Sequence, residues 1–207
     1  LLEQTSDGRE LWGVTHGAGT YLAVGGQGYL ATSPDAVNWT ASSLPGDDNL
    51  YGAAFGAGLF VVVGTEGTIA TSPDAQTWTL ANSGTSENLY GVSFQNGQFL
   101  AGGLNGTLLT SPDGFAWTPR ANNALHAIHS FTFGNNTYVL GGAGTLQTSL
   151  DSIIWTKDEA GTGHFQVATA FGNDTFVVVG HVGTVLRSQD GQTWTGGSSG
   201  STHNLDS

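Results

Sequence analysis

The chain has 207 residues and carries 16 acidic side chains against four lysines and arginines, a net charge of −12. Phosphate-rich and anionic surfaces bind clustered cations. The scattered Arg9, Arg120, Lys157 and Arg187 therefore argue against nucleic acid and anionic membranes as partners. No apolar run approaches the roughly 18 residues of a membrane-spanning helix, so no membrane insertion is expected. With no cysteine, neither disulfides nor thiol chemistry can contribute.

Residues 1–10 align with the connections between later repeats and are expected to form a closing strand or connection. Four strands are then predicted in each repeat, most clearly in residues 50–88. There, strands at 50–55 and 59–63 flank a Gly-rich turn, and the second is apolar throughout, as in a strand buried on both faces. A turn at 65–67 leads to a third strand at 68–71, and a fourth starts at 78.

A tryptophan recurs at nearly constant spacing along the chain. Trp39, Trp78, Trp117, Trp155 and Trp194 lie 39, 39, 38 and 39 residues apart. A period of about 40 residues made of short strands is typical of propeller blades. The sequence therefore predicts an all-β, five-bladed β-propeller of four-stranded blades in one domain over residues 1–195. The expected blades are 11–49, 50–88, 89–127, 128–165 and 166–195, and the Gly/Ser-rich 196–207 is expected to be a tail.

Each tryptophan ends a short phrase, Ser-x-Asp-x-x-x-Trp, which we call the Asp motif. Its aspartates are Asp35, Asp74, Asp113, Asp151 and Asp190. Short Asp and Ser side chains bond to turn backbone groups, while Trp packs between blades. We therefore expect the motif to be structural.

The Asp motif resembles the Asp-box, or BNR repeat, of sialidases, photosystem II assembly factors and many bacterial surface proteins. The likeness covers about residues 11–195, with Trp four residues after Asp instead of the usual five. It implies a propeller whose ligand site lies on the face away from the motif. It also suggests a secreted or cell-surface protein.

The sialidase catalytic set is not expected in this chain. Sialidases that carry the repeat use three arginines that converge on the substrate carboxylate. Here Arg187 directly precedes an Asp motif, and Arg9 and Arg120 fall in connections between blades, so the three cannot easily meet. No enzyme activity is therefore expected, and no catalytic residue is assigned.

Acidic residues in the connections leave two further hypotheses open. Asp47, Asp48, Glu66, Glu87, Asp158 and Glu159 could supply a carboxylate pair for another glycoside hydrolase. Asp47-Asp48 and Asp158-Glu159 could also bind Ca²⁺, although neither has the ligand spacing of a calcium loop. No cofactor or metal is assigned.

The predicted ligand site lies near the start of the innermost strands. Trp12, Tyr51, Tyr90, His129 and Val167 share one repeat position, with Asn49 and Asn88 adjacent and Gln27, Glu66 and Asn105 in neighbouring hairpins. Aromatic rings can bury the apolar surface of a ligand while amides and carboxylates form hydrogen bonds with its polar groups. The alternative for these aromatics is that they only fill the channel or pack between blades. One hypothesis is a glycan- or surface-ligand-binding module. The alternative is a structural or assembly protein that docks other proteins.

Four glycosylation sequons start at Asn38, Asn105, Asn135 and Asn173. They matter only if the chain passes through a eukaryotic secretory pathway.

Overall fold

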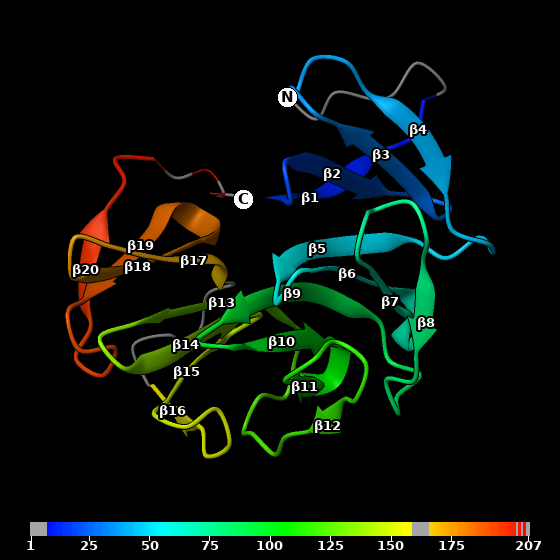
Figure 1. Cartoon of the computed structure of the whole chain (residues 1–207). Coiled ribbons are helices and arrows are strands. Elements are labelled where there is room, and N and C mark those ends of the chain that lie inside the picture. The colour runs from blue at the N-terminus through cyan, green and yellow to red at the C-terminus, as the bar shows by residue number, and fades with distance from the viewer. Residues whose placement is uncertain (1–7, 159–165, 202, 204, 206–207) are drawn as a thin grey trace. The chain divides into compact units, whose positions relative to one another are not determined.

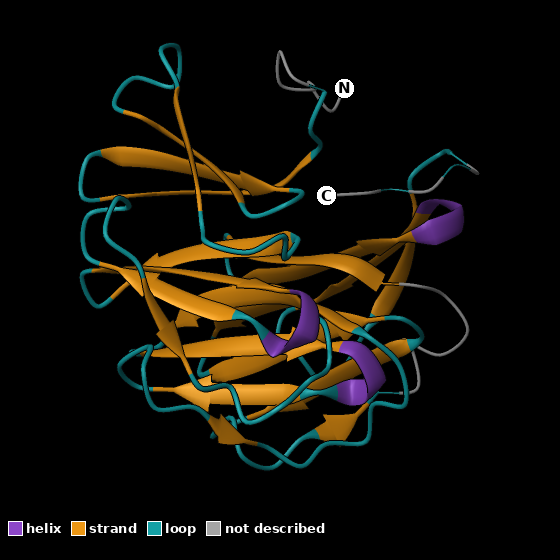
Figure 2. Cartoon of the chain, turned by 90° about the vertical axis from the view of Figure 1, so that its right-hand side faces the viewer, coloured by secondary structure: helices purple, strands orange, loops and turns teal. Residues whose placement is uncertain are grey.

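The computed structural model describes residues 8–158, 166–201, 203 and 205. In this part of the chain, strands dominate (Figures 1 and 2). Twenty strands form five antiparallel sheets of four, and in every sheet the strands follow one another in chain order. The described helical segments are 3-10 turns of three residues: η1 (Thr65–Gly67), η2 (Leu104–Gly106) and η4 (His181–Gly183).

The strands of the five sheets have the following bounds. The first sheet contains β1 (Leu11–Gly17), β2 (Thr20–Gly25), β3 (Tyr29–Ser33) and β4 (Thr40–Ser43). The second contains β5 (Leu50–Gly56), β6 (Leu59–Gly64), β7 (Ile69–Ser72) and β8 (Thr79–Ala81). The third contains β9 (Leu89–Gln95), β10 (Gln98–Gly103), β11 (Leu108–Ser111) and β12 (Thr118–Pro119). The fourth contains β13 (Ile128–Gly134), β14 (Thr137–Gly142), β15 (Thr145–Ser149) and β16 (Thr156–Lys157). The fifth contains β17 (Gln166–Gly172), β18 (Thr175–Gly180), β19 (Thr184–Ser188) and β20 (Thr195–Ser198).

These bounds agree with the predicted strands of residues 50–88 to within a residue. One difference concerns the expected tail, because residues 196–198 belong to β20. Gly197 pairs with Val185 of β19 and Ser198 pairs with Thr184, so the outer strand continues where composition suggested a linker.

The chain divides into two compact units, which we describe separately. Unit 1 comprises Leu1–Ala101 and Leu109–Thr118, and unit 2 comprises Gly102–Leu108 and Pro119–Ser207. The closing role expected for residues 1–10 falls mostly on residues outside the described part. Closure into a single ring over residues 1–195 stays a prediction.

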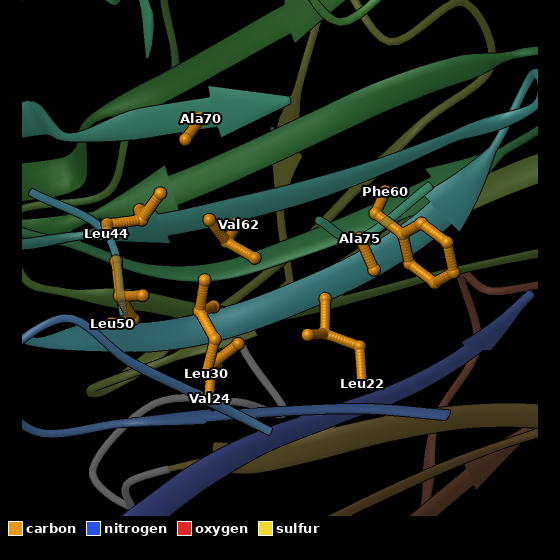
Figure 3. Packing of buried hydrophobic residues seen from close by; sticks show 9 residues of the cluster. All are labelled: Leu22, Val24, Leu30, Leu44, Leu50, Phe60, Val62, Ala70 and Ala75. Carbon is orange, nitrogen blue, oxygen red and sulfur yellow. The ribbon is translucent and has the colours of Figure 1, made fainter. Parts of the chain in front are cut away.

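The core of unit 1 lies between successive sheets. Leu22, Val24 and Leu30 of the first sheet meet Phe60 and Val62 of the second, and all five side chains are buried (Figure 3). The other face of β6 presents Val61 and Val63 to a second cluster, which includes Leu89 and Phe99 of the third sheet. This double burial explains why β6 is apolar at every position instead of alternating.

The core of unit 2 repeats this arrangement between the fourth and fifth sheets. Val139 of β14 and Leu146 of β15 pack against Phe176, Val178 and Leu186 of the fifth sheet. Within each unit, neighbouring sheets thus bury apolar faces against each other, as in sheet-on-sheet packing.

Glycine at the end of an innermost strand allows the next sheet to approach closely. A Cβ on Gly17, Gly56 or Gly134 would fall 1.9 to 2.3 Å from a ring atom of the phenylalanine of the next sheet, Phe55, Phe94 or Phe171. Because no real Cβ contact is that short, these positions accept no side chain without repacking.

Candidate functional site

The Asp motif forms a closed set of hydrogen bonds within its own turn. Oδ1 of each aspartate accepts the backbone amides two and three residues later at 2.7–2.9 Å. The preceding serine hydroxyl donates to the same carboxylate at 2.8–3.1 Å. The amide three residues on is the main reason that the pKa of each carboxyl lies below its usual range. The carboxylates stay ionised and engaged in the turn.

Three tryptophans of the motif pack against the core clusters between sheets. Trp78 contacts the cluster between the first and second sheets, Trp117 that between the second and third, and Trp194 that between the fourth and fifth. Trp155 is only 5 % exposed, whereas Trp39 is 42 % exposed. Trp39 therefore departs from the expected buried position, and it is not part of the cluster between the first and second sheets.

Aromatic side chains form a row along the inner strands of unit 1. The ring centroids of Trp12 and Tyr51 are 5.2 Å apart, and those of Tyr51 and Tyr90 are also 5.2 Å apart. Trp12 and Tyr51 are the extra residues of β-bulges, since Leu11 and Gly13 pair with consecutive residues of β2, and Leu50 and Gly52 pair with consecutive residues of β6. A bulge redirects a side chain from the alternation of the strand. The structure thus brings these three predicted residues together.

A pocket opens beside Trp12, at the end of the aromatic row. Its volume is about 440 Å³, and the predicted residues Trp12, Gln27 and Asn49 line it together with Arg9 and Glu10. The guanidinium carbon of Arg9 lies 5.4 Å from the centre of the Tyr29 ring, in the range of a cation–π contact. The lining therefore includes one aromatic residue and one residue of each charge sign.

Asn49 and Asn88 have a structural task that the sequence did not reveal. The side-chain oxygen of Asn49 accepts the amide of Gln27 at 3.0 Å, and that of Asn88 accepts the amide of Glu66 at 3.0 Å. Gln27, Glu66 and the equivalent Asn105 all have positive φ, between 52° and 57°. The asparagines thus stabilise strained hairpins, while the side chains at the hairpin tips stay exposed.

In unit 2 the same repeat position carries His129. Burial lowers the pKa of His129, and the nearby His181 lowers it further. The imidazole is therefore neutral at physiological pH. The side chain of Val167, the fifth predicted member, lies outside the described part.

Among the acidic candidates for hydrolysis or Ca²⁺ binding, Asp48 takes part in hydrogen bonds. Asp48 accepts the hydroxyls of Thr65 at 3.1 Å and Thr68 at 2.9 Å, so its carboxylate braces the η1 hairpin. No group of three His, Asp or Glu side chains among the described residues is placed to hold a metal ion. Glu159 lies outside the described residues.

None of the described helices has the length and apolar character that crossing a membrane requires.

Comparisons with solved structures identify the architecture. A structure of YCF48 bound to a D1 peptide superposes with a TM-score of 0.68 at 15 % identity, over 89 % of this chain and 65 % of that chain. YCF48 from Cyanidioschyzon merolae gives 0.70 at 21 % identity, over 99 % and 78 % of the two chains. The WD40 propeller domain of Doa1 gives 0.67 at 14 % identity, over 97 % and 72 %.

The fold is a β-propeller. Its five described sheets are the blades. At these identities the likeness concerns fold alone, and this propeller spans about two thirds of the first of those structures. The sequence matches no protein-family model and no curated protein.

Proposed function

We propose that this propeller is a non-catalytic binding module that docks a peptide segment of a partner protein along the aromatic row. The pocket beside Trp12 carries the proposal. There Trp12, Arg9 and Glu10 line one space of about 440 Å³. Its lining is mostly polar, so Trp12 supplies the apolar contact while the surrounding residues supply directional polar groups.

Ring geometry favours a peptide over a glycan along the middle of the row. Tyr51 has two aromatic neighbours, each at 5.2 Å between ring centroids, so less of its ring is open for stacking on a sugar. The side-chain oxygens of Asn49 and Asn88 also bond to hairpin amides. Fewer polar groups are left for sugar hydroxyls than the sequence suggested.

A glycan is the second candidate ligand, and only at the pocket beside Trp12. Trp12 ends the row and is 38 % exposed, so its ring can stack on a sugar that enters the pocket.

Two further features support a protein partner. The YCF48 propeller is described as bound to a D1 peptide, which illustrates peptide binding on a similar fold. The net charge of −12 favours neutral or basic segments through long-range attraction. We include in the proposal that the Asp motifs are Asp-boxes with a purely structural role.

Screening the purified propeller against a peptide array and a glycan array tests the proposal. The best peptide is then titrated against Trp12→Ala and Asp113→Ala. Trp12→Ala should weaken binding about tenfold or more, because aromatic anchors dominate such sites. Asp113→Ala should leave the affinity unchanged, because its carboxylate bonds only within its turn. Hits confined to glycans would replace the peptide with a sugar, and equal affinity of folded Trp12→Ala and the parent protein would refute the site.

A further inference from the structure

The fourth Asp motif has large aliphatic side chains at two positions, Leu150 and Ile154, where none of the other motifs has one. The position of Ile153 is apolar in the first and third motifs as well, as Val37 and Phe115. Leu150 stands where the first three motifs have proline, and Ile153 and Ile154 follow its aspartate. Leu150 is 64 %, Ile153 51 % and Ile154 72 % exposed. Grouped apolar side chains on a surface turn mark a contact site more often than a core requirement.

Two of these three residues border a groove within unit 2. Its volume is about 400 Å³, and Leu150 and Ile154 line it with Thr156, Lys157 and Asp158. Gln192, from the Asp motif of the fifth blade, also contributes to the lining. Ile153 does not border the groove, although it is adjacent in sequence and similarly exposed.

The fifth blade has a groove at the corresponding repeat positions, of about 480 Å³. There Gln189 and Thr193 take the places of Leu150 and Ile154, and both line it. Since the same turn folds with polar residues in the fifth blade, folding does not require the apolar pair in the fourth. The pair is therefore available for a ligand.

The charges beside the groove indicate what that ligand carries. The lining residues include two acidic side chains, Asp151 and Asp158, and one basic side chain, Lys157. Turn amides, first that of Ile154, hold the pKa of Asp151 below its usual range, so it stays negative at neutral pH. The groove thus joins an aliphatic wall to a net negative edge.

The outer strand favours an extended ligand. β16 is the last strand of its sheet and pairs with β15 through only Thr156 and Lys157. An edge strand offers backbone groups to an added strand, while side-chain pockets beside it select the sequence.

We propose that this groove is a second docking site, distinct from the aromatic row, for an extended segment of a partner protein. The segment places an aliphatic side chain between Leu150 and Ile154 and a lysine or arginine near Asp151 and Asp158.

Fluorescence anisotropy with two labelled peptides tests this site. The first is Ala-Arg-Val-Leu-Val-Arg-Ala, and the second has glutamate in place of both arginines. The propeller should bind the first saturably, and about tenfold or more tighter than the second at low salt, because ionic attraction is strongest there. Absence of saturable binding, or equal binding of the two peptides, would overturn the proposal.

The fifth blade supplies the test substitutions. Leu150→Gln and Ile154→Thr introduce the residues already found in the equivalent turn, and each should weaken the first peptide about tenfold, or about 1.4 kcal/mol. Ile153→Thr is the matched control and should change the affinity less than about twofold. Trp12→Ala should also leave it unchanged, which separates this site from the aromatic row. Equal losses in Ile153→Thr and Ile154→Thr would show that the groove is not the binding site.

Discussion

Replacing Gly56 by alanine should destabilise the propeller by a predictable amount. Gly56 ends β5, and an added Cβ would lie 1.9 Å from Cγ and 2.4 Å from Cβ of Phe94. Carbon atoms pack best at about 3.5–4.0 Å, so the ring must retreat by roughly 1.5 Å or more. That shift disturbs its edge-on contact with Phe99, at 4.8 Å between centroids.

The cost follows from these contacts. Overpacking a core typically costs about 1–3 kcal/mol, and losing an aromatic pair adds about 0.5–1.5 kcal/mol. We expect the free energy of unfolding to fall by about 3 kcal/mol. The melting temperature should fall by roughly 6–12 °C, since a domain of this size loses about 2–4 °C per kcal/mol.

Gly172 provides the matched control, because it ends β17 at the same repeat position with no atom within 4 Å of an added Cβ. Gly172→Ala should leave stability unchanged or raise it by up to about 1 kcal/mol, since alanine restricts the unfolded chain. Urea unfolding followed by tryptophan fluorescence measures both variants. If Gly56→Ala were as stable as the parent, or no less stable than Gly172→Ala, the close approach of the second and third blades would be wrong.

Two further predictions concern the tryptophans and pH. Trp117→Ala should lower the free energy of unfolding by about 3 kcal/mol, because Trp117 packs on a core cluster. Trp39→Ala should lower it by less than half of that, because Trp39 is 42 % exposed. Equal urea midpoints for the two variants would contradict this difference. The lowered pKa of His129 means that the unfolded chain takes up its proton first as pH falls below about 6.5. The free energy of unfolding should therefore fall on acidification from pH 7 to 5. It should fall less steeply in His129→Tyr, which has tyrosine at this repeat position as the second and third blades do. Identical pH profiles of the two proteins in urea titrations would show that His129 is not the cause.

Local sequence signals predicted most of the fold. A turn with an aspartate acceptor and a glycine-rich hairpin each act through neighbours a few residues away, so their pattern is visible in the chain. The all-apolar strand reflects burial between two sheets, but its composition is equally visible. The turn bonds of Asp113 to the amides of Phe115 and Ala116 involve no distant residue. Because each of these patterns recurs in five repeats, the prediction of the fold did not depend on any single copy.

The candidate site was only partly predictable. Repeat alignment placed Trp12, Tyr51 and Tyr90 at one position, and in the structure the ring centroid of Tyr51 lies 5.2 Å from those of both Trp12 and Tyr90. The bonds of Asn49 reach Gln27, which is 22 residues earlier, and no pattern in the sequence announced that partner. An asparagine expected to bind ligand thus braces a neighbouring hairpin.

The sequence by itself determined the period, the strands and the chemistry of the turns, because these depend on contacts between residues close in the chain. Only the tertiary structure decided that Trp39 is exposed while Trp155 is buried, and that Ile154 borders a groove while Ile153 does not. Equivalent residues of a repeat have the same local geometry but different neighbours from other blades. Burial and pocket formation depend on those neighbours, which lie far away in the sequence and come together only when the sheets pack.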